Sequence, residues 1–584
     1  MSKPDSAQDT KQYASAAPFV VAVSGHRDLH PDDVAGAGER VFEALQLVAD
    51  TLPDSALDFL SPLADGGDQL FAAQVLRLRA ASDRPARIRL LVPLPMPLDA
   101  YCAEQGQGDS AAFAARIAPY LQAADDVFEI APIALDAAVT LENAPYARLA
   151  RYLAIHAHLV IAVWDGVEAP VAAPGGTLDL VHALARGFKR CADARSASRL
   201  AQPDFGRVLH VLARRAQSDA PPPDGAAGLR VLANHGGGAR ACIRAAGADL
   251  DTLNRRHRAS LAGDSASYGA RLAAVRGDFL SSVGTSESLC DPALAALARS
   301  FAVADVQAEE AKRGWRLSWI VIALGAVLAA SSSLLRLFSD AYGELIETVS
   351  YGGGAAVAVG TYLWVGRAGR RNAYLAYRAL AEGLRVQMYW LAAGSTALVS
   401  DYYLVKQGDD AGWVRDALDA LTCAPATRTL APAQVARGWI DAQLSYLEGP
   451  NIARRRRQHA LQAACGRNLL IGGMVCALIG VGLTLHGAAK NAVVTVALII
   501  AMKLLTDTGA AWLSFNGKMA HAQNLRQAAH LRAVYRRADQ ALLAIERDGG
   551  DPHDLLAALG KEILDENANW LRLYLERRIE WHGH

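Results

Sequence analysis

Leu317–Leu335, with the sequence LSWIVIALGAVLAASSSLL, contains nineteen residues and no charged side chain. Thr348–Val365, with the sequence TVSYGGGAAVAVGTYLWV, adds eighteen uncharged residues after a short acidic turn. A helix needs about 20 mostly apolar residues to cross the hydrocarbon core of a bilayer, and tilt and interfacial residues widen that range. The two stretches therefore predict a transmembrane hairpin whose two ends lie on one side of a membrane.

A second apolar pair follows at Asn468–Leu485 (NLLIGGMVCALIGVGLTL) and Asn491 to about Trp512. Basic residues flank the outer ends of both pairs, whereas the two turns hold only Arg336, Lys490 and a few acids. Because basic residues stay on the cytoplasmic side, the pattern predicts four crossings of the cell inner (plasma) membrane with both termini in the cytoplasm. The flanking basic residues are Lys312, Arg313, Arg316, Arg367, Arg370, Arg371, Arg454 to Arg457, Arg467, Lys518 and Arg526.

The fourth apolar segment contains two charged residues, Lys503 and Asp507. Charged groups near the middle of a bilayer are costly and usually face a partner or water. Their i, i+4 spacing places the two side chains on one helix face, where they can pair. One interpretation is a conduction path lined by this helix. The other is that the crossing ends near Leu505 and that Lys503 extends to the cytoplasmic interface.

Bulk composition limits the possible classes of protein. The chain has 584 residues and a formal net charge of zero, which argues against nucleic acid as a partner because phosphate binding favours a surplus of Lys and Arg. Its seven cysteines include no C-x-x-C pair, so neither a zinc site nor a disulfide framework is expected. Residues 1–17 are polar and Ala-rich, without the apolar core of a cleavable signal, and we expect a disordered leader there.

The first half of the chain alternates strand and helix patterns, which is typical of a parallel sheet covered by helices on both faces. Strands are expected at Phe19–Ser24, Leu57–Leu63, Ile88–Val92 and Leu159–Trp164. Helices are expected at Asp32–Thr51, from Gln69 onward and at Leu178–Arg186. The sequence therefore predicts an N-terminal α/β Rossmann-like domain with a parallel sheet, followed by an all-α membrane domain with four transmembrane helices and cytosolic helices.

Small and polar residues follow the expected strands, at the sheet edge where such folds bind ligands. Free N–H groups at helix starts there favour a phosphate or another anion. Arg27 could pair with a phosphate, and Asp65 or Asp68 could accept hydrogen bonds from ribose hydroxyls. The alternative is that the glycines only form tight turns. The predicted binding residues are Gly25, His26, Arg27, Asp65, Gly66, Gly67, Asp68, Asp165, Gly175, Gly176 and Thr177.

Three motifs in this half, Gly25-His26-Arg27, LADGGDQLFA at 63–72 and IAVWDG with GGTLDLV between 161 and 181, resemble the SLOG superfamily. This superfamily comprises Rossmann-like domains related to the DNA-processing protein DprA, to cytokinin-activating phosphoribohydrolases and to the N-terminal domain of melastatin-type channels. The resemblance implies a nucleotide-derived ligand, ADP-ribose-like or a cyclic nucleotide, and no required cofactor. The enzymatic members have a PGGxGTxxE signature with a catalytic Glu. This chain has PGGTLDLV, with Asp179 only loosely in that place, which favours binding over hydrolysis.

The second half resembles the SLATT family of membrane modules through YRALAEGLRVQMYW (377–390), WIDAQLSYL (439–447) and DENANWLRLYLERR (565–578). Such modules are linked to SLOG domains in bacterial defence systems and are thought to form pores. The resemblance implies a ligand-gated membrane effector or ion channel, assembled as a homo-oligomer in a lipid bilayer. The alternative is a membrane-tethered nucleotide or phosphoribosyl hydrolase.

These expectations divide the chain into eight parts: a leader (1–17), a SLOG-like domain (18–190), its extension with a loop at 216–240 (191–300), a coupling helix (301–316), the first transmembrane hairpin (317–366), cytosolic helices (367–467), the second hairpin (468–513) and C-terminal cytosolic helices (514–584).

Overall fold

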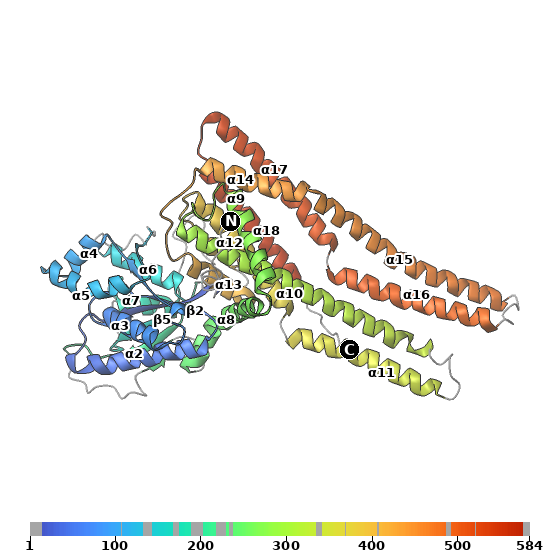
Figure 1. The fold of residues 1–584 in the computed structure, drawn as a ribbon, viewed down its shortest axis with the longest axis horizontal. Helices are drawn as coiled ribbons and strands as arrows, with labels where there is room; N and C mark the ends of the chain where they lie inside the picture. The colour runs from blue at the N-terminus through green and yellow to red at the C-terminus, as the bar shows by residue number, and fades with distance from the viewer. Residues whose placement is uncertain are drawn as a thin grey trace. The chain divides into compact units, whose positions relative to one another are not determined.

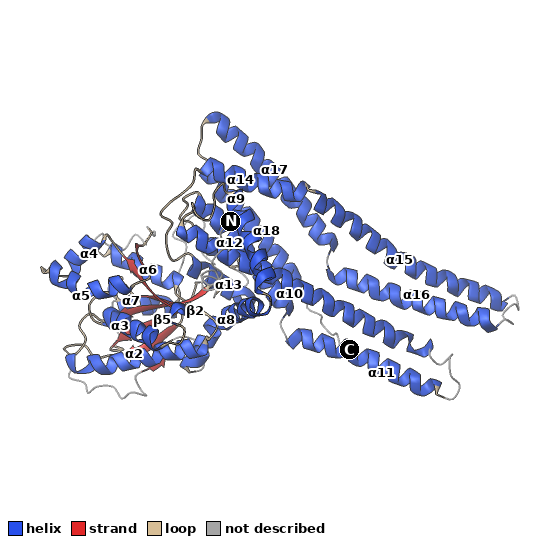
Figure 2. Cartoon of the chain, viewed as in Figure 1, coloured by secondary structure: helices blue, strands red, loops and turns tan. Residues whose placement is uncertain are grey.

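The structure is a computed structural model, drawn in Figure 1 and coloured by secondary structure in Figure 2. It describes residues 15–106, 108–131, 143–167, 174–188, 203–217, 229–232, 238–334, 342–367, 370–405, 408–485, 492–519 and 521–575. Contacts between residues divide the chain into two compact units. Unit 1 comprises Met1–Asp305, Ala379–Ala431 and Gly560–His584, and unit 2 comprises Val306–Arg378 and Pro432–Leu559.

Unit 1 is built on a seven-stranded sheet with the order β4-β3-β2-β1-β5-β6-β7. All neighbouring strands pair in parallel except β6 and β7, which are antiparallel. This arrangement confirms the predicted Rossmann-like parallel sheet. The strands are β1 (Pro18–Gly25), β2 (Ala56–Leu60), β3 (Ile88–Leu94), β4 (Asp126–Glu129), β5 (Leu159–Trp164), β6 (Val208–Leu212) and β7 (Leu229–Val231).

The central strands β1 and β5 are almost wholly apolar because helices cover both faces of the sheet. In β1, Phe19 to Ala22 have no exposed surface. Val20 and Ala22 pack into a cluster with apolar residues of α6 and α7, while α2 and α3 pack against one another. The helices of this region are α2 (Pro31–Thr51), α3 (Gly67–Ala81), the 3₁₀ turn η1 (Pro85–Arg87), α4 (Leu98–Gln105), α5 (Ser110–Ala123), α6 (Ala144–His156) and α7 (Thr177–Arg186).

A segment from far along the chain completes unit 1. α13 (Gly408–Leu421) packs against α6 and β1. The Tyr152 hydroxyl on α6 donates to the Cys423 carbonyl at 2.6 Å, and His156 Nδ1 lies 2.7 Å from the Asp419 carbonyl. The residues that follow the first apolar pair therefore return to the sheet. Also in this unit are α8 (Ala239–Gly263), α9 (Ser265–Ser282), the 3₁₀ turn η4 (Val399–Asp401) and most of α12 (Arg370–Ala392) and α18 (His553–Leu575).

Residues 1–14 of the expected leader lie outside the described residues. Its last residues belong to the fold, since Ala16 and Ala17 are buried and both backbone N–H groups donate to Asn254 Oδ1 on α8. β6 and β7 extend the sheet into residues 191–300, beyond the four strands expected from the sequence. β2 ends at Leu60 rather than Leu63, and α3 begins at Gly67 rather than Gln69. Leu63 has a positive φ of 60°, which is incompatible with an extended strand.

Unit 2 consists of long helices. α10 (Pro292–Ser331) enters it from unit 1 as one helix of forty residues that contains the expected coupling segment 301–316. The others are α11 (Gly343–Arg367), α14 (Pro432–Glu448), α15 (Pro450–Leu485), α16 (Ala492–Met519) and α17 (His521–Asp548). Among the described residues, three helical stretches are long and apolar enough to span a membrane: Pro292–Leu334, Pro432–Leu485 and Val493–Gly517. α11 is not among them.

Within each apolar pair, glycine permits close helix packing. A Cβ on Gly354 of α11 would lie 2.7 Å from the Gly325 carbonyl oxygen of α10. A Cβ on Gly473 of α15 would lie 2.5 Å from the Thr506 methyl of α16. Other glycines of α11 and α15 differ: Gly352, Gly353, Gly480 and Gly482 face open space, and Gly472 has ordinary contact distances.

The two charged residues of α16 pair as their spacing predicts. Lys503 Nζ lies 3.5 Å from Asp507 Oδ2. The same carboxylate oxygen accepts a hydrogen bond from Ser331 Oγ of α10 at 3.2 Å. Asp507 thus has polar partners on two helices of unit 2, as intramembrane charges usually require.

Candidate functional site

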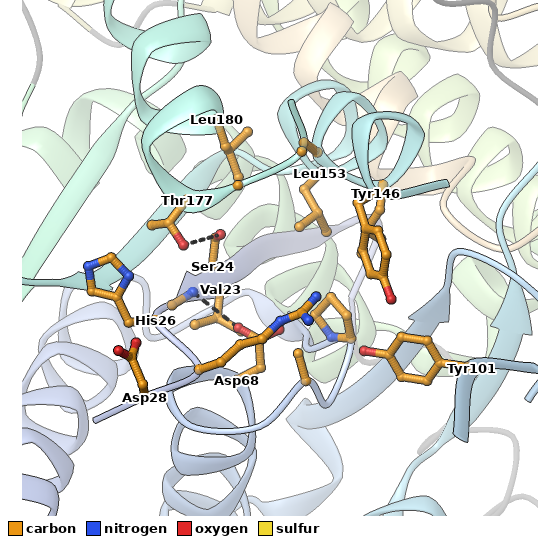
Figure 3. A pocket seen from close by; sticks show the side chains of 18 of the residues that line it. Val23, Ser24, His26, Asp28, Asp68, Tyr101, Tyr146, Leu153, Thr177 and Leu180 are labelled. Carbon is orange, nitrogen blue, oxygen red and sulfur yellow. Dashed lines mark hydrogen bonds between the residues drawn. The ribbon is translucent and has the colours of Figure 1, made fainter. Parts of the chain in front are cut away.

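A cavity of about 260 Å³ opens at the carboxyl ends of the parallel strands. Figure 3 shows the side chains that surround it. β1 is the point at which strand order reverses, because β2, β3 and β4 follow on one side and β5 and β6 on the other. Such switch points are where open α/β sheets bind ligands. The lining residues come from the segments after β1, β2, β3, β5 and β6 and from α6.

Asp68 is the acidic group at the floor of the cavity. Its carboxylate is 6% exposed, and Oδ1 accepts a hydrogen bond from the Gly25 N–H at 3.1 Å. Burial raises its pKa from 3.8 to about 7, although the Arg27 charge and the backbone hydrogen bonds from Gly25 and Ala64 lower it. Desolvation penalises the ionised form, so a large fraction of Asp68 is protonated at neutral pH.

Tyr101 and Tyr146 form the opposite side of the cavity. Figure 3 shows their two hydroxyl groups directed to the same region, near Asp68. Tyr101 has no exposed surface, and its hydroxyl has no hydrogen-bond partner within the described part of the chain. An unsatisfied buried hydroxyl costs free energy, and a ligand with a polar group would remove that cost. Burial also raises the pKa of Tyr101 well above its usual value, so the phenol remains a donor.

Arg27 supplies a positive charge to the cavity, whose lining also includes the ion pair of Arg215 with Asp28. It follows β1 directly, and its guanidinium carbon lies 5.2 Å from the centre of the Tyr146 ring. Across the cavity, α7 begins at Thr177 with Gly176 as its N-cap. The first N–H groups of a helix lack partners within the helix and favour an anion. A phosphate placed between Arg27 and the start of α7 would meet both.

A second polar group borders this region. His26 Nε2 lies 3.2 Å from Asp165 Oδ1. Ser24 Oγ donates to Thr177 Oγ1 at 3.1 Å, linking the end of β1 to the start of α7 (Figure 3). These contacts fix the two loops after β1 and β5 relative to each other.

Several of the candidate glycines have a role in chain packing. A Cβ on Gly66, whose φ is +78°, would lie 2.3 Å from the His26 carbonyl oxygen, and one on Gly67 would lie 2.7 Å from the Gly25 Cα. Gly175, with φ of +79°, lies equally close to the Tyr146 backbone. Chain packing thus already requires glycine at 66, 67 and 175.

Seven of the eleven predicted binding residues line the cavity, namely Gly25, His26, Arg27, Asp68, Gly175, Gly176 and Thr177. Gly66, Gly67, Asp65 and Asp165 are adjacent to it in the chain but are not lining residues. Asp65 instead pairs with Arg116 at 3.0 Å and accepts from Gln69 at 2.9 Å. Sequence reasoning did not assign Tyr146, Leu149, Ala150 and Leu153, because α6 precedes β5 and carries no loop motif.

Asp179, the residue nearest to the catalytic acid of the SLOG signature, accepts the Gly175 N–H at 2.9 Å. Its carboxylate therefore stabilises the start of α7. Among the described residues, no group of three or more His, Cys, Asp or Glu side chains is arranged to hold a metal ion.

No known protein family model, curated protein or solved structure matches this chain.

Proposed function

We propose that the protein is a ligand-gated membrane effector. A small nucleotide-type anion binds in the cavity of unit 1 and shifts the arrangement of the membrane helices in a homo-oligomer, forming or opening a pore. The observation that carries this proposal is a single chain in which a cavity lined by Arg27 and the start of α7 is followed by helices of membrane length. A ligand changes such an equilibrium only by binding one arrangement more tightly than the other.

The chemistry of the cavity supports a phosphorylated ligand with neutral polar groups. Arg27 and the first N–H groups of α7 suit a phosphate, as at other helix starts. Asp68 and Tyr101 offer a carboxyl and a phenol suited to hydroxyl or amide groups, such as those of a ribose or a base. A volume of about 260 Å³ is small for a ligand pocket. A cyclic nucleotide therefore fits better than an extended ADP-ribose-like molecule.

The exposed surface of the helices supports insertion in a membrane. Leu478 and Leu485 of α15 and Val493 of α16 are 65%, 80% and 77% exposed, and monomeric soluble proteins rarely expose large apolar patches. In the proposed topology α11 provides the fourth crossing, and basic flanks keep both termini in the cytoplasm. Lys503 and Asp507 are the residues that we assign to the membrane interior as candidates for a conduction path.

α6 provides a route from the cavity to the rest of unit 1. Tyr146 and Leu153 line the cavity, whereas Tyr152 and His156 of the same helix bond to the α13 segment. A ligand that moves α6 would therefore move the segment that precedes α14 in the chain.

The direct test is ion flux from liposomes that contain the purified full chain, measured against a panel of cyclic and linear nucleotides. We expect flux with at least one nucleotide that also binds in calorimetry. Arg27→Glu should weaken that binding about 100-fold, because removal of a charged partner and repulsion of the anion act together. Arg116→Glu, at the exposed pair with Asp65, is the matched control and should leave binding unchanged.

If a nucleotide binds tightly and no flux follows for any ion, the gating proposal is wrong. If Arg27→Glu binds as tightly as the unaltered protein, the ligand occupies another site.

One observation favours a second candidate, a membrane-tethered nucleotide or phosphoribosyl hydrolase. A buried carboxyl with a pKa near 7 in a cleft is suited to general acid–base catalysis. Release of base or phosphate by the purified full chain, with loss of that release in Asp68→Asn, would support this candidate in place of the receptor.

A further inference from the structure

The segments of unit 2 that flank the second apolar pair have an unusual charge distribution. Between Glu448 and Asp539 the chain contains one acidic residue, Asp507, and twelve Lys and Arg residues. Arg454 to Arg457 near the start of α15 are all exposed, as is Arg526 of α17. Adjacent like charges repel one another unless an anion is present.

Among the described residues, Arg454, Arg456, Arg457 and Arg526 have no ion pair. Arg455 has a neutral partner, since its Nη1 donates to the Tyr446 hydroxyl at 3.3 Å. By contrast, Arg532 and Arg536 of α17 both pair with Glu448, at 3.0 and 2.7 Å. In the described part of the chain, Arg532 and Arg536 thus have an acidic partner, whereas the four arginines nearer to the apolar segments have none.

Two contacts locate these arginines along the helices. Glu448 at the end of α14 pairs with Arg532 of α17, and Trp512 Nε1 of α16 donates to the Gln462 carbonyl of α15 at 2.8 Å. The chain through α14 and α15 therefore runs antiparallel to the chain through α16 and α17. Arg454 lies six residues from Glu448, and Arg526 lies six residues from Arg532. At 1.5 Å per residue of α17, Arg526 lies about 9 Å from the ion pair, towards the apolar end. Arg454 follows the same ion pair in the chain, near the start of α15. Arg454 and Arg526 therefore both lie on the apolar side of that ion pair.

Trp512 marks the expected position of the membrane interface, where Trp side chains gather. Gln462 is the residue that Trp512 contacts. Arg457 is five residues before Gln462 in α15, so it lies about 7.5 Å from the level of Trp512, on the side away from the apolar segment. The headgroup layer on each side of a bilayer is about 5 to 8 Å thick. An arginine side chain at this height reaches lipid phosphate groups, to which a guanidinium binds with two parallel hydrogen bonds.

We propose that Arg454, Arg456, Arg457 and Arg526 form a binding surface for the phosphate headgroups of acidic phospholipids. The inference rests on the proposed membrane insertion and is independent of the nucleotide site. An acidic lipid surface supplies the missing counter-charge of the four arginines and fixes the height of α15 and α17 at the bilayer.

The test uses the full chain reconstituted in nanodiscs with equal amounts of phosphatidylglycerol and phosphatidylcholine, followed by native mass spectrometry of retained lipid. We expect about a ten-fold preference for phosphatidylglycerol, which falls as salt rises because the interaction is screened. The variant with Arg454, Arg456, Arg457 and Arg526 all changed to Gln should lose the preference. The same four positions changed to Lys should keep most of it.

The matched control is a variant in which four exposed arginines of unit 1 are changed to Gln, which removes the same charge. These arginines are Arg77, Arg84, Arg116 and Arg255. This control should retain the full lipid preference. Inorganic phosphate or glycerol phosphate, added at a concentration on the order of 10 mM as a competing anion, should not displace the lipid. Displacement would identify a site for soluble anions instead.

A preference that persists in the four-Gln variant, or its absence in the unaltered chain, would overturn the inference. Resistance to alkaline carbonate extraction measures membrane insertion separately. A chain that inserts without lipid preference contradicts only the lipid surface, whereas a chain released by carbonate contradicts the proposed membrane function as well.

Discussion

The protonation state of Asp68 should affect both the stability of the fold and the affinity for an anionic ligand. Its pKa is about 7 in the folded chain and 3.8 in the unfolded chain. Between these values the folded state binds more protons, so this residue lowers stability as pH rises from about 4 to 7. Asn retains an oxygen that can accept the Gly25 N–H but does not ionise. We expect Asp68→Asn to melt at a higher temperature than the unaltered chain at pH 8 and at a similar temperature at pH 4, measured by differential scanning calorimetry in detergent.

The same titration sets the pH dependence of anion binding. Ionised Asp68 places a negative charge within the cavity. Because the pKa is about 7, the affinity for a nucleotide should fall by up to about five-fold between pH 7 and 8. Asp68→Asn should bind with little change over this range. Calorimetric titration at pH 6, 7 and 8 measures both. Parallel pH profiles for the two proteins would show that Asp68 does not face the ligand.

A single substitution, Tyr101→Phe, should have opposite effects on stability and on ligand binding. Its hydroxyl is buried without a partner in the described structure, so Tyr101→Phe should stabilise the free protein by about 1 kcal/mol. The same change should weaken nucleotide binding about ten-fold, because the bound ligand loses a hydrogen bond. A thermal melt without ligand and a calorimetric titration provide the two values. Tyr120→Phe on α5, outside the cavity lining, is the control.

At the scale of elements, the second apolar pair depends on one close approach. A side chain at Gly473 would meet the Thr506 side chain and the Met502 carbonyl, whereas Gly480 on the same helix faces open space. Gly473→Leu should destabilise the α15/α16 hairpin by about 1–3 kcal/mol through overpacking, and Gly480→Leu should not. Thermal aggregation of the two variants in detergent compares them directly. Equal losses would indicate that α15 and α16 do not pack through Gly473.

The contact between α6 and α13 is the element-scale link between the cavity and the returning chain. Tyr152→Phe removes the hydrogen bond to the buried Cys423 carbonyl and should cost about 1 kcal/mol of stability. In hydrogen–deuterium exchange, nucleotide should increase the protection of α13 in the unaltered chain and do so less in Tyr152→Phe. Unchanged protection of α13 in both proteins would exclude this route.

Sequence patterns predicted elements that have their own periodicity and missed those that depend on distant contacts. β1, β2, β3 and β5 are runs of buried apolar residues bounded by turns, so they were found. β4 is four mostly exposed residues, and β6 contains His210, buried by its bond to the Trp164 carbonyl. The place of α13 on the sheet follows from contacts more than 250 residues apart in sequence. Tyr146 reaches the cavity only because α6 crosses it, which no local motif encodes.

At the scale of the whole molecule, the chain passes between the two units inside helices at three of its four junctions. α10, α12 and α18 each contain residues of both units, at Asp305–Val306, Arg378–Ala379 and Leu559–Gly560. A continuous helix is semi-rigid and transmits displacement along its axis, whereas a glycine-rich linker behaves as a flexible coil and does not. Coupling of the nucleotide site to the membrane helices, if it uses α10, therefore requires this helix to be continuous.

Insertion of four glycines between Asp305 and Val306 should interrupt α10, since each glycine costs about 1 kcal/mol in a helix interior. We expect nucleotide binding and membrane insertion to persist, because each unit keeps its own core, while nucleotide-dependent flux is lost. The same insertion after Gly549, an exposed turn residue with φ of +65° between α17 and α18, should leave flux intact. Nucleotide-dependent flux that survives the α10 insertion would show that the signal travels through α12, α18 or the segment before α14.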